Sequence, residues 1–128
     1  MSHDRRHITS GSPYERTIGF SRAVRAGRHV FVSATAAISP GGHVDPDAGA
    51  QARRCLEIVE AALGDVGATL RDVVRTRVFL VDAAYGPAVA QAHGEVFGEI
   101  RPASGFIVVQ GFLDPRWLVE IEADAVAC

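Results

Sequence analysis

The last quarter of the chain most constrains the fold. Residues 101–128 read RPASGFIVVQGFLDPRWLVEIEADAVAC, which is two apolar runs joined by a turn-rich connection at residues 111–116. Each run is too short to cross a membrane, and β-branched residues favour strands over helices. In the second run apolar and acidic residues alternate, and a strand places alternate residues on opposite faces. We therefore predict a β-hairpin whose second strand has one apolar face and one acidic face.

The acidic face of this strand has two interpretations. For Glu122 and Asp124 a solvated surface is the simpler explanation. Glu120 differs, because the predicted hairpin partner offers Ser104 and Phe106 on a single face beside it. The pattern therefore predicts that Glu120 lines the wall of a pocket.

Upstream, strand and helix patterns alternate. Strands are predicted at 15–26, 29–37 and 73–81, and apolar stripes with a spacing of three and four predict helices at 46–66 and 83–97. Asp45 is the expected N-cap of the first helix and Gly67 its C-terminal cap. Because strand-helix-strand connections are right-handed, we predict an α+β fold with a mixed sheet and both helices on one face.

The size of the chain limits it to one domain. It has 128 residues, of which 48% are hydrophobic, enough for a single core. Residues 1–12 are polar and lack periodicity, so we predict a flexible N-terminal arm followed by one domain at residues 13–128.

Charge and cysteine content exclude several partners. The 13 basic and 15 acidic side chains give a formal charge of −2, so neither nucleic acid nor a membrane is an expected partner. Cys55 and Cys128 are far apart and no secretory segment is recognised, which predicts free thiols and a cytoplasmic location. The sequence shows no dinucleotide fingerprint and no metal-ligand cluster, so no cofactor and no metal are expected.

One face of the predicted sheet has no helix to cover it. We expect apolar side chains to project from that face, namely Phe20, Phe31, Phe106 and Val108. A soluble monomer rarely exposes such a patch, which predicts an oligomer.

Several separated motifs resemble one family. They are GFSRAV at residues 19–24, VSATAA at 32–37, DVVRTRVFLVD at 72–82, and RPAS followed by LVEIEADAVA near the C-terminus. Together they resemble the Rid family, the reactive intermediate deaminases formerly called YjgF proteins. The resemblance implies a six-stranded sheet of the chorismate-mutase-like type, and a homotrimer with a central barrel and ligand pockets between subunits.

The resemblance also implies a site. In deaminating members, an arginine after the Pro-Ala pair binds the substrate carboxylate and a glutamate in the last strand positions the hydrolytic water. This chain keeps that glutamate as Glu120 and the serine of VSA as Ser33, but Ser104 occupies the place of the arginine. Phe20 and Phe106 replace a tyrosine and a cysteine. The chain therefore resembles a subgroup that lacks the carboxylate-binding arginine.

Losing that arginine weakens the expected binding of simple amino-acid imines, because two hydrogen bonds to a charge are worth about 1.5 to 3 kcal/mol each. Arg22 on the first strand and Arg101 before the pocket strand are candidate substitute cations. The predicted substrate-binding set is Phe20, Arg22, Ser33, Arg101, Ser104 and Phe106, with Glu120 as the catalytic residue.

Three functional hypotheses follow. The first is an enamine or imine hydrolase with altered specificity, acting on more apolar or aromatic substrates. The second is a non-catalytic trimer that binds a metabolite or has a regulatory role. The third is an endoribonuclease, which the acidic charge balance disfavours.

Overall fold

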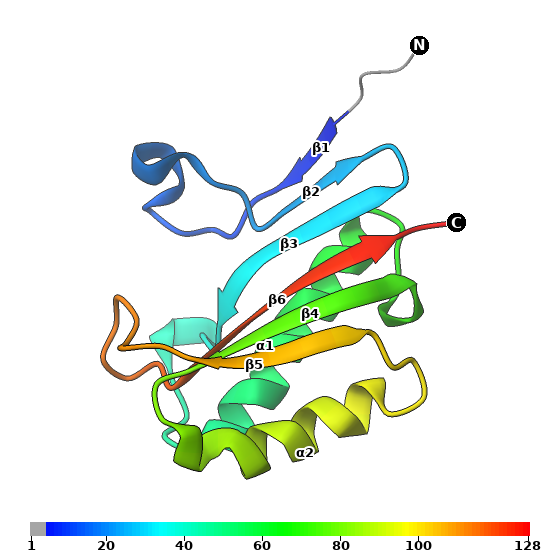
Figure 1. Ribbon diagram of the computed structural model, residues 1–128. Helices are drawn as coiled ribbons and strands as arrows, with labels where there is room; N and C mark the ends of the chain where they lie inside the picture. The colour runs from blue at the N-terminus through cyan, green and yellow to red at the C-terminus, as the bar shows by residue number, and fades with distance from the viewer. Residues whose placement is uncertain (1–4) are drawn as a thin grey trace.

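The computed structural model describes residues 5–128 and contains one sheet with two main helices (Figure 1). The strands are β1 (Arg5–Ile8), β2 (Ala23–Ala26), β3 (His29–Ala36), β4 (Val73–Leu80), β5 (Ala103–Val108) and β6 (Val119–Val126). The helices are α1 (Ala48–Asp65) and α2 (Gly86–Phe97), and short helical turns lie at Glu15–Gly19, Pro40–Gly42, Leu70–Asp72 and Ala83–Tyr85. This is the predicted α+β fold, with six strands.

The six strands form a mixed sheet in the order β1-β2-β3-β6-β4-β5. Only β4 and β5 run parallel, and the other neighbours are antiparallel. Both helices lie on one face of the sheet (Figure 1). The core between the layers is built from fully buried residues such as Leu63, Val78, Phe97 and Ile121. Neither α1 nor α2 covers the opposite face of the sheet (Figure 1).

The alternation in the last strand is confirmed. In β6 the apolar residues Val119, Ile121, Ala123 and Ala125 are buried, and the residues between them are half-buried. Arg77 of β4 bridges the other two acidic residues, with Nη1 at 2.9 Å from Glu122 and 3.4 Å from Asp124. These two carboxylates therefore form an ion-pair network on the sheet face, which leaves Glu120 apart from it.

The predicted hairpin of the last two strands is wrong. β5 pairs with β4 in parallel, and β4 separates β5 from β6. The sheet register places Ser104 and Phe106 beside Thr76 and Val78. Side chains that are paired in register share a face, so Ser104, Phe106 and Val108 project toward the helix side at the sheet edge and not from the uncovered face.

The N-terminal region also differs from the prediction. Residues 15–19 form a helical turn, so the expected strand at 15–26 shortens to β2. Arg5–Ile8 forms the edge strand β1, paired with β2, where a flexible arm was expected. Residues 1–4 of that arm lie outside the described residues. No periodic signal marks β1 in the sequence, because its side chains are mostly exposed.

The first helix begins two residues later than predicted. Asp47, and not Asp45, is its N-cap, and its Oδ2 accepts a hydrogen bond of 2.8 Å from the amide of Ala50. Gly67 follows the helix with φ of +78°, the left-handed conformation that glycine adopts most readily. Within residues 5–128, no helix is both long enough and apolar enough to cross a lipid bilayer.

Candidate functional site

Glu120 lies near the start of β6, paired across the sheet with Ala36 of β3 and Phe79 of β4. Its carboxyl is half-buried, and this burial raises its pKa above the ordinary value of 4.5. The positive charge of Arg22 acts in the opposite direction and favours the ionised form. Glu120 is thus a partly desolvated carboxylate beside a cation.

Arg22 is held where β2 and β3 diverge. Its Nη1 donates to Thr35 Oγ1 at 2.9 Å and to Ser33 Oγ at 3.2 Å, and the Ser33 hydroxyl in turn donates to the Arg22 carbonyl at 3.1 Å. A register shift between Val32 and Thr35 in β3 lies at this contact. A β-bulge of this kind redirects side chains, which explains how Ser33 and Thr35 both reach one guanidinium.

The electrostatic surroundings of Arg22 are unusual for an arginine. Burial lowers its pKa, and the nearby groups Glu15 and Glu120 raise it. None of the ion pairs within 4.0 Å in residues 5–128 includes Arg22. Its guanidinium is therefore bound to two neutral hydroxyls and not to a carboxylate, which leaves it able to attract an anionic group.

Two further predicted residues border this region less closely. Phe20 is half-buried at the end of the 15–19 turn, where its amide donates to the Glu15 carbonyl at 3.2 Å. Arg101 is exposed with φ of +56°, and its amide donates to the Phe97 carbonyl. Both assignments as ligand-binding residues remain predictions.

Ser104 and Phe106 lie in a second group, at the edge of the sheet. Thr76 Oγ1 lies 2.8 Å from Ser104 Oγ and 2.8 Å from His93 Nε2 of α2. The imidazole packs against Phe97 with ring centroids 4.7 Å apart and meets the edge of Phe106 at 5.9 Å. Burial lowers the pKa of His93.

The two groups do not meet within one chain. Thr76 pairs with Ala123 of β6 and shares its face, while Glu120 projects from the opposite face. β4 also lies between β6 and β5. The predicted site residues therefore divide into a carboxylate group around Glu120 and Arg22, and a hydroxyl group around Ser104.

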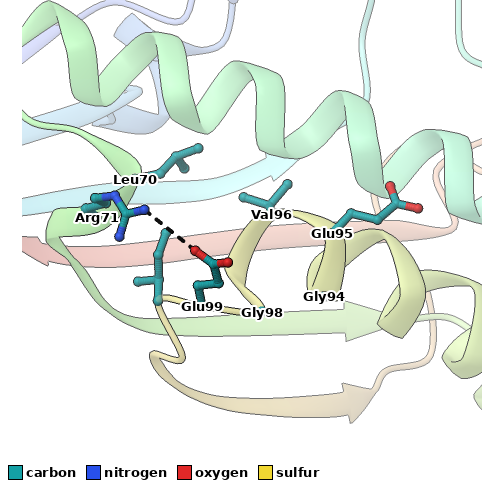
Figure 2. Close-up of a pocket in the computed structure, with 8 residues that line it drawn as sticks. Leu70, Arg71, Gly94, Glu95, Val96, Gly98 and Glu99 are labelled. Atoms are coloured by element: carbon teal, nitrogen blue, oxygen red, sulfur yellow. Dashed lines mark ion pairs between the residues drawn. The ribbon is translucent and has the colours of Figure 1, made fainter.

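One pocket formed by the described residues lies elsewhere. Its volume is about 470 Å³, between the Leu70–Asp72 turn and the C-terminal end of α2. Figure 2 shows Arg71 and Glu99 pointing toward each other across it, with a distance of 3.8 Å between Arg71 Nη2 and Glu99 Oε2. Both side chains are mostly exposed, and none of the predicted site residues lines this pocket. It is therefore not the site that the sequence pointed to.

Neither a metal cluster nor the Cys55 thiol adds to these groups among the described residues. Within the described part of the chain, no three His, Cys, Asp or Glu side chains gather as a metal site. Cys55 is free but buried, which raises its pKa to about 12. A thiol with such a pKa stays protonated at neutral pH and is a poor nucleophile.

Comparison with known proteins identifies the family. A family model described as endoribonuclease L-PSP matches residues 12–127. The chain belongs to this family, which is the YjgF or Rid family that the sequence motifs resemble.

Individual relatives cover most of the chain. An uncharacterized protein of Streptomyces coelicolor is 39% identical over 123 residues, which are 94% of this chain and 90% of the relative. The 3-aminoacrylate deaminase RutC of Acinetobacter baylyi is 37% identical over 106 residues, 80% of this chain and 82% of that protein.

Solved structures agree with the fold. A YjgF-family protein of Mycobacterium tuberculosis is 42% identical with a TM-score of 0.89, covering 97% of this chain and 100% of that one. TdcF of E. coli, solved with bound serine, is 25% identical with a TM-score of 0.82, covering 96% of this chain and 94% of that one.

Sequence reasoning missed two participants. It assigned no role to Thr35 or Thr76, which bind Arg22 and His93. Both threonines are fully buried with their hydroxyls hydrogen-bonded. A threonine in a strand is ordinary by propensity, so only the positions of partners far along the chain distinguish these two.

Proposed function

We propose that this protein hydrolyses an enamine or imine of a small molecule, with Glu120 positioning and deprotonating the water. The single observation that carries the proposal is a half-buried carboxylate whose pKa is raised by burial while the cation Arg22 favours its ionised form. A carboxylate with a raised pKa is a stronger base, and a neighbouring cation keeps enough of it ionised to act. The 37% identity to a 3-aminoacrylate deaminase supports this reaction class.

The proposed reaction adds one water and releases ammonia. An enamine is first protonated at carbon by a proton from solvent, which gives its iminium ion. Glu120 then takes a proton from water while the oxygen forms a bond to the iminium carbon, and the C=N electron pair moves to nitrogen. The proton on Glu120 next passes to the amine nitrogen, the C–N bond breaks, and ammonia leaves while the hydroxyl loses its proton to solvent and becomes a carbonyl. No redox step is needed.

A homotrimer is part of this proposal. The carboxylate group and the hydroxyl group lie on opposite faces of one sheet, so a single chain does not bring them together. Packing of three chains side by side joins the Glu120 group of one subunit to the Ser104 group of its neighbour. The pocket then lies between subunits, as the family resemblance implies.

The proposed substrate is less charged than an amino-acid imine. Ser104 offers one neutral hydroxyl where the family resemblance expects a guanidinium fork, and Phe106 is 40% exposed beside it. An apolar or aromatic substituent fits this wall better than a carboxylate.

The test is an assay of imine hydrolysis with substrates generated in situ. We compare 3-aminoacrylate, 2-iminopropionate and an aromatic imine, using wild type, Glu120→Gln and Ser104→Arg. We expect wild type to favour the aromatic imine, Glu120→Gln to lose at least about 100-fold in rate, and Ser104→Arg to gain activity on 2-iminopropionate. Glu60→Gln is the matched control, because it neutralises an exposed acid on α1, away from the sheet face that carries Glu120. Equal rates for wild type and Glu120→Gln on any hydrolysed substrate would refute the mechanism.

Metabolite binding without turnover is the second candidate. The related structure of TdcF contains bound serine, so a ligand is held by a protein of this fold. Calorimetric binding of a substrate analogue by wild type, combined with no hydrolysis of the three substrates, would favour a binding or regulatory role. An endoribonuclease is not proposed, because the formal charge of −2 provides no cationic groove for a phosphate backbone.

A further inference from the structure

Three side chains from three elements form a continuous chain of hydrogen bonds at the edge of the sheet. Ser104 lies on the edge strand β5 and is exposed, Thr76 lies on β4 and is fully buried, and His93 on α2 is half-buried. Both links have a length of 2.8 Å. These hydrogen bonds therefore connect a solvent-facing hydroxyl to a half-buried imidazole.

The direction of the two hydrogen bonds is coupled, because the Thr76 hydroxyl has a single proton to donate. The 2.8 Å contacts of Thr76 with Ser104 and with His93 allow two coupled arrangements. In the first, Thr76 donates to Ser104 Oγ and its oxygen accepts from His93, with the imidazole proton on Nε2; in the second, both hydrogen bonds are reversed. The first arrangement leaves the Ser104 proton free to point outward.

The surroundings of His93 keep the imidazole neutral. Two aromatic rings, Phe97 and Phe106, pack against it. Burial is the cause of its lowered pKa, without a contribution from a charged side chain. The hydrogen-bonded series of Ser104, Thr76 and His93, here called the relay, therefore presents a neutral donor. An arginine at the position of Ser104 would present a cation.

We propose that His93 and Thr76 are positioning residues that orient the Ser104 hydroxyl as an outward donor to a neutral carbonyl oxygen of the ligand. The ligand class is a small amide, ester or ketone with an apolar substituent that contacts Phe106. A carboxylate is disfavoured, because a single neutral hydroxyl compensates poorly for removing a full charge from water. This proposal rests on the proposed function in one respect, namely that Ser104 borders the ligand pocket.

The first experiment measures the relay without any ligand. Protein labelled with ¹⁵N at histidine, in its full-length form, reports which ring nitrogen of His93 carries the proton. We expect Nε2 to be protonated, with this proton protected from exchange with water, and we expect Thr76→Val to remove the protection. Ser39→Ala is the control, because it deletes a serine hydroxyl outside the relay. Protonation of His93 on Nδ1 in wild type, or unchanged protection in Thr76→Val, would overturn the relay.

The second experiment measures ligand preference with two probes that differ in charge alone. Pyruvamide and pyruvate have nearly the same shape, and NMR titration gives a dissociation constant for each. We expect wild type to bind pyruvamide more tightly than pyruvate. Ser104→Ala should weaken pyruvamide binding about tenfold, the upper range for one neutral hydrogen bond, and Thr76→Val should weaken it by a smaller factor. Tighter binding of pyruvate, or an unchanged pyruvamide constant in Ser104→Ala, would overturn the ligand class.

The two proposals fail separately. If Glu120→Gln hydrolyses substrate as fast as wild type, the deaminase mechanism is wrong, while the protonation state of His93 and the pyruvamide preference still test the relay. If the relay fails while Glu120→Gln is inactive, the hydrolase stands and Ser104 has another role.

Discussion

At the scale of single residues, two opposing effects set the charge of Glu120. Desolvation favours the protonated carboxyl, and Arg22 favours the carboxylate. Arg22 is itself partly desolvated and bound by two neutral hydroxyls, so it retains charge that is not neutralised by an ion pair. The same arrangement that suits Glu120 for base catalysis also makes it costly for folding.

This cost predicts a pH-dependent stability difference. A carboxyl whose pKa is higher in the folded state binds its proton more tightly there than in the unfolded state. The free energy of unfolding therefore falls as the pH rises from the unfolded-state pKa to the folded-state pKa. Glu120→Gln has no carboxyl at this position, so its free energy of unfolding does not fall in this way. We expect Glu120→Gln to gain stability relative to wild type as the pH rises above about 4.5, and the difference to level off once wild-type Glu120 is ionised.

Urea unfolding of the two proteins from pH 4 to pH 8 measures this difference. Glu122→Gln serves as the control, because its carboxylate is paired with Arg77 and should show no such gain. A Glu120→Gln protein that loses stability relative to wild type as the pH rises would contradict the burial argument.

At the scale of elements, a buried side-chain amide connects α1 to the segment that precedes β6. Gln51 is fully buried, and its Nε2 donates to the carbonyls of Asp45 at 2.7 Å and Arg116 at 2.9 Å. Its Oε1 accepts from the amide of Leu118 at 2.9 Å. Glu120 lies two residues after Leu118, so Gln51 helps to fix the position of β6.

Replacing this amide predicts a large loss of stability. Gln51→Leu retains the approximate volume but removes the partner of two carbonyls and one amide, at an expected cost of about 2 to 4 kcal/mol. Equilibrium urea unfolding at a fixed protein concentration measures it. Gln91→Leu, on the exposed side of α2, is the matched control and should change stability by less than about 0.5 kcal/mol. Equal stability of both variants would show that the Gln51 contacts contribute little.

At the scale of the whole molecule, the sheet face opposite the helices exposes large apolar side chains. Phe31 is 49% exposed and Ile107 is 43% exposed, and the register places both on the face opposite the helices. The ion-pair network of Arg77 with Glu122 and Asp124 lies on that same face. Mixed apolar and paired polar groups of this kind are typical of subunit interfaces.

We therefore expect the protein to be a homotrimer in solution. Sedimentation equilibrium should give about three times the chain mass of 13.6 kDa. Phe31→Asp places an unpaired charge in the predicted interface and should shift the protein toward monomer, with loss of imine hydrolysis because the pocket needs two subunits. His43→Ala, outside the strands, is the control. A monomeric wild type would contradict both the trimer and the shared pocket.

The sequence by itself determined the local elements and the family. Alternation in β6 and the apolar stripes of both helices are short-range patterns. The burial of residues such as Val119 and Ile121 can therefore be predicted from their immediate neighbours in the sequence. The same alternation places Glu120 on the half-buried face of β6, while its role in a site was implied by the family resemblance and stays a prediction. The N-cap was misplaced by two residues because Asp45 and Asp47 both suit that position.

Only the tertiary structure decided which strands pair and which side chains meet. Strand pairing depends on contacts between segments far apart in sequence, and adjacency along the chain favoured a hairpin that β4 in fact interrupts. The contacts of Arg22 with Thr35 and of Thr76 with Ser104 follow from a bulge and from strand register. Neither leaves a periodic signal, because hydrogen-bond geometry depends on spatial position and not on residue spacing.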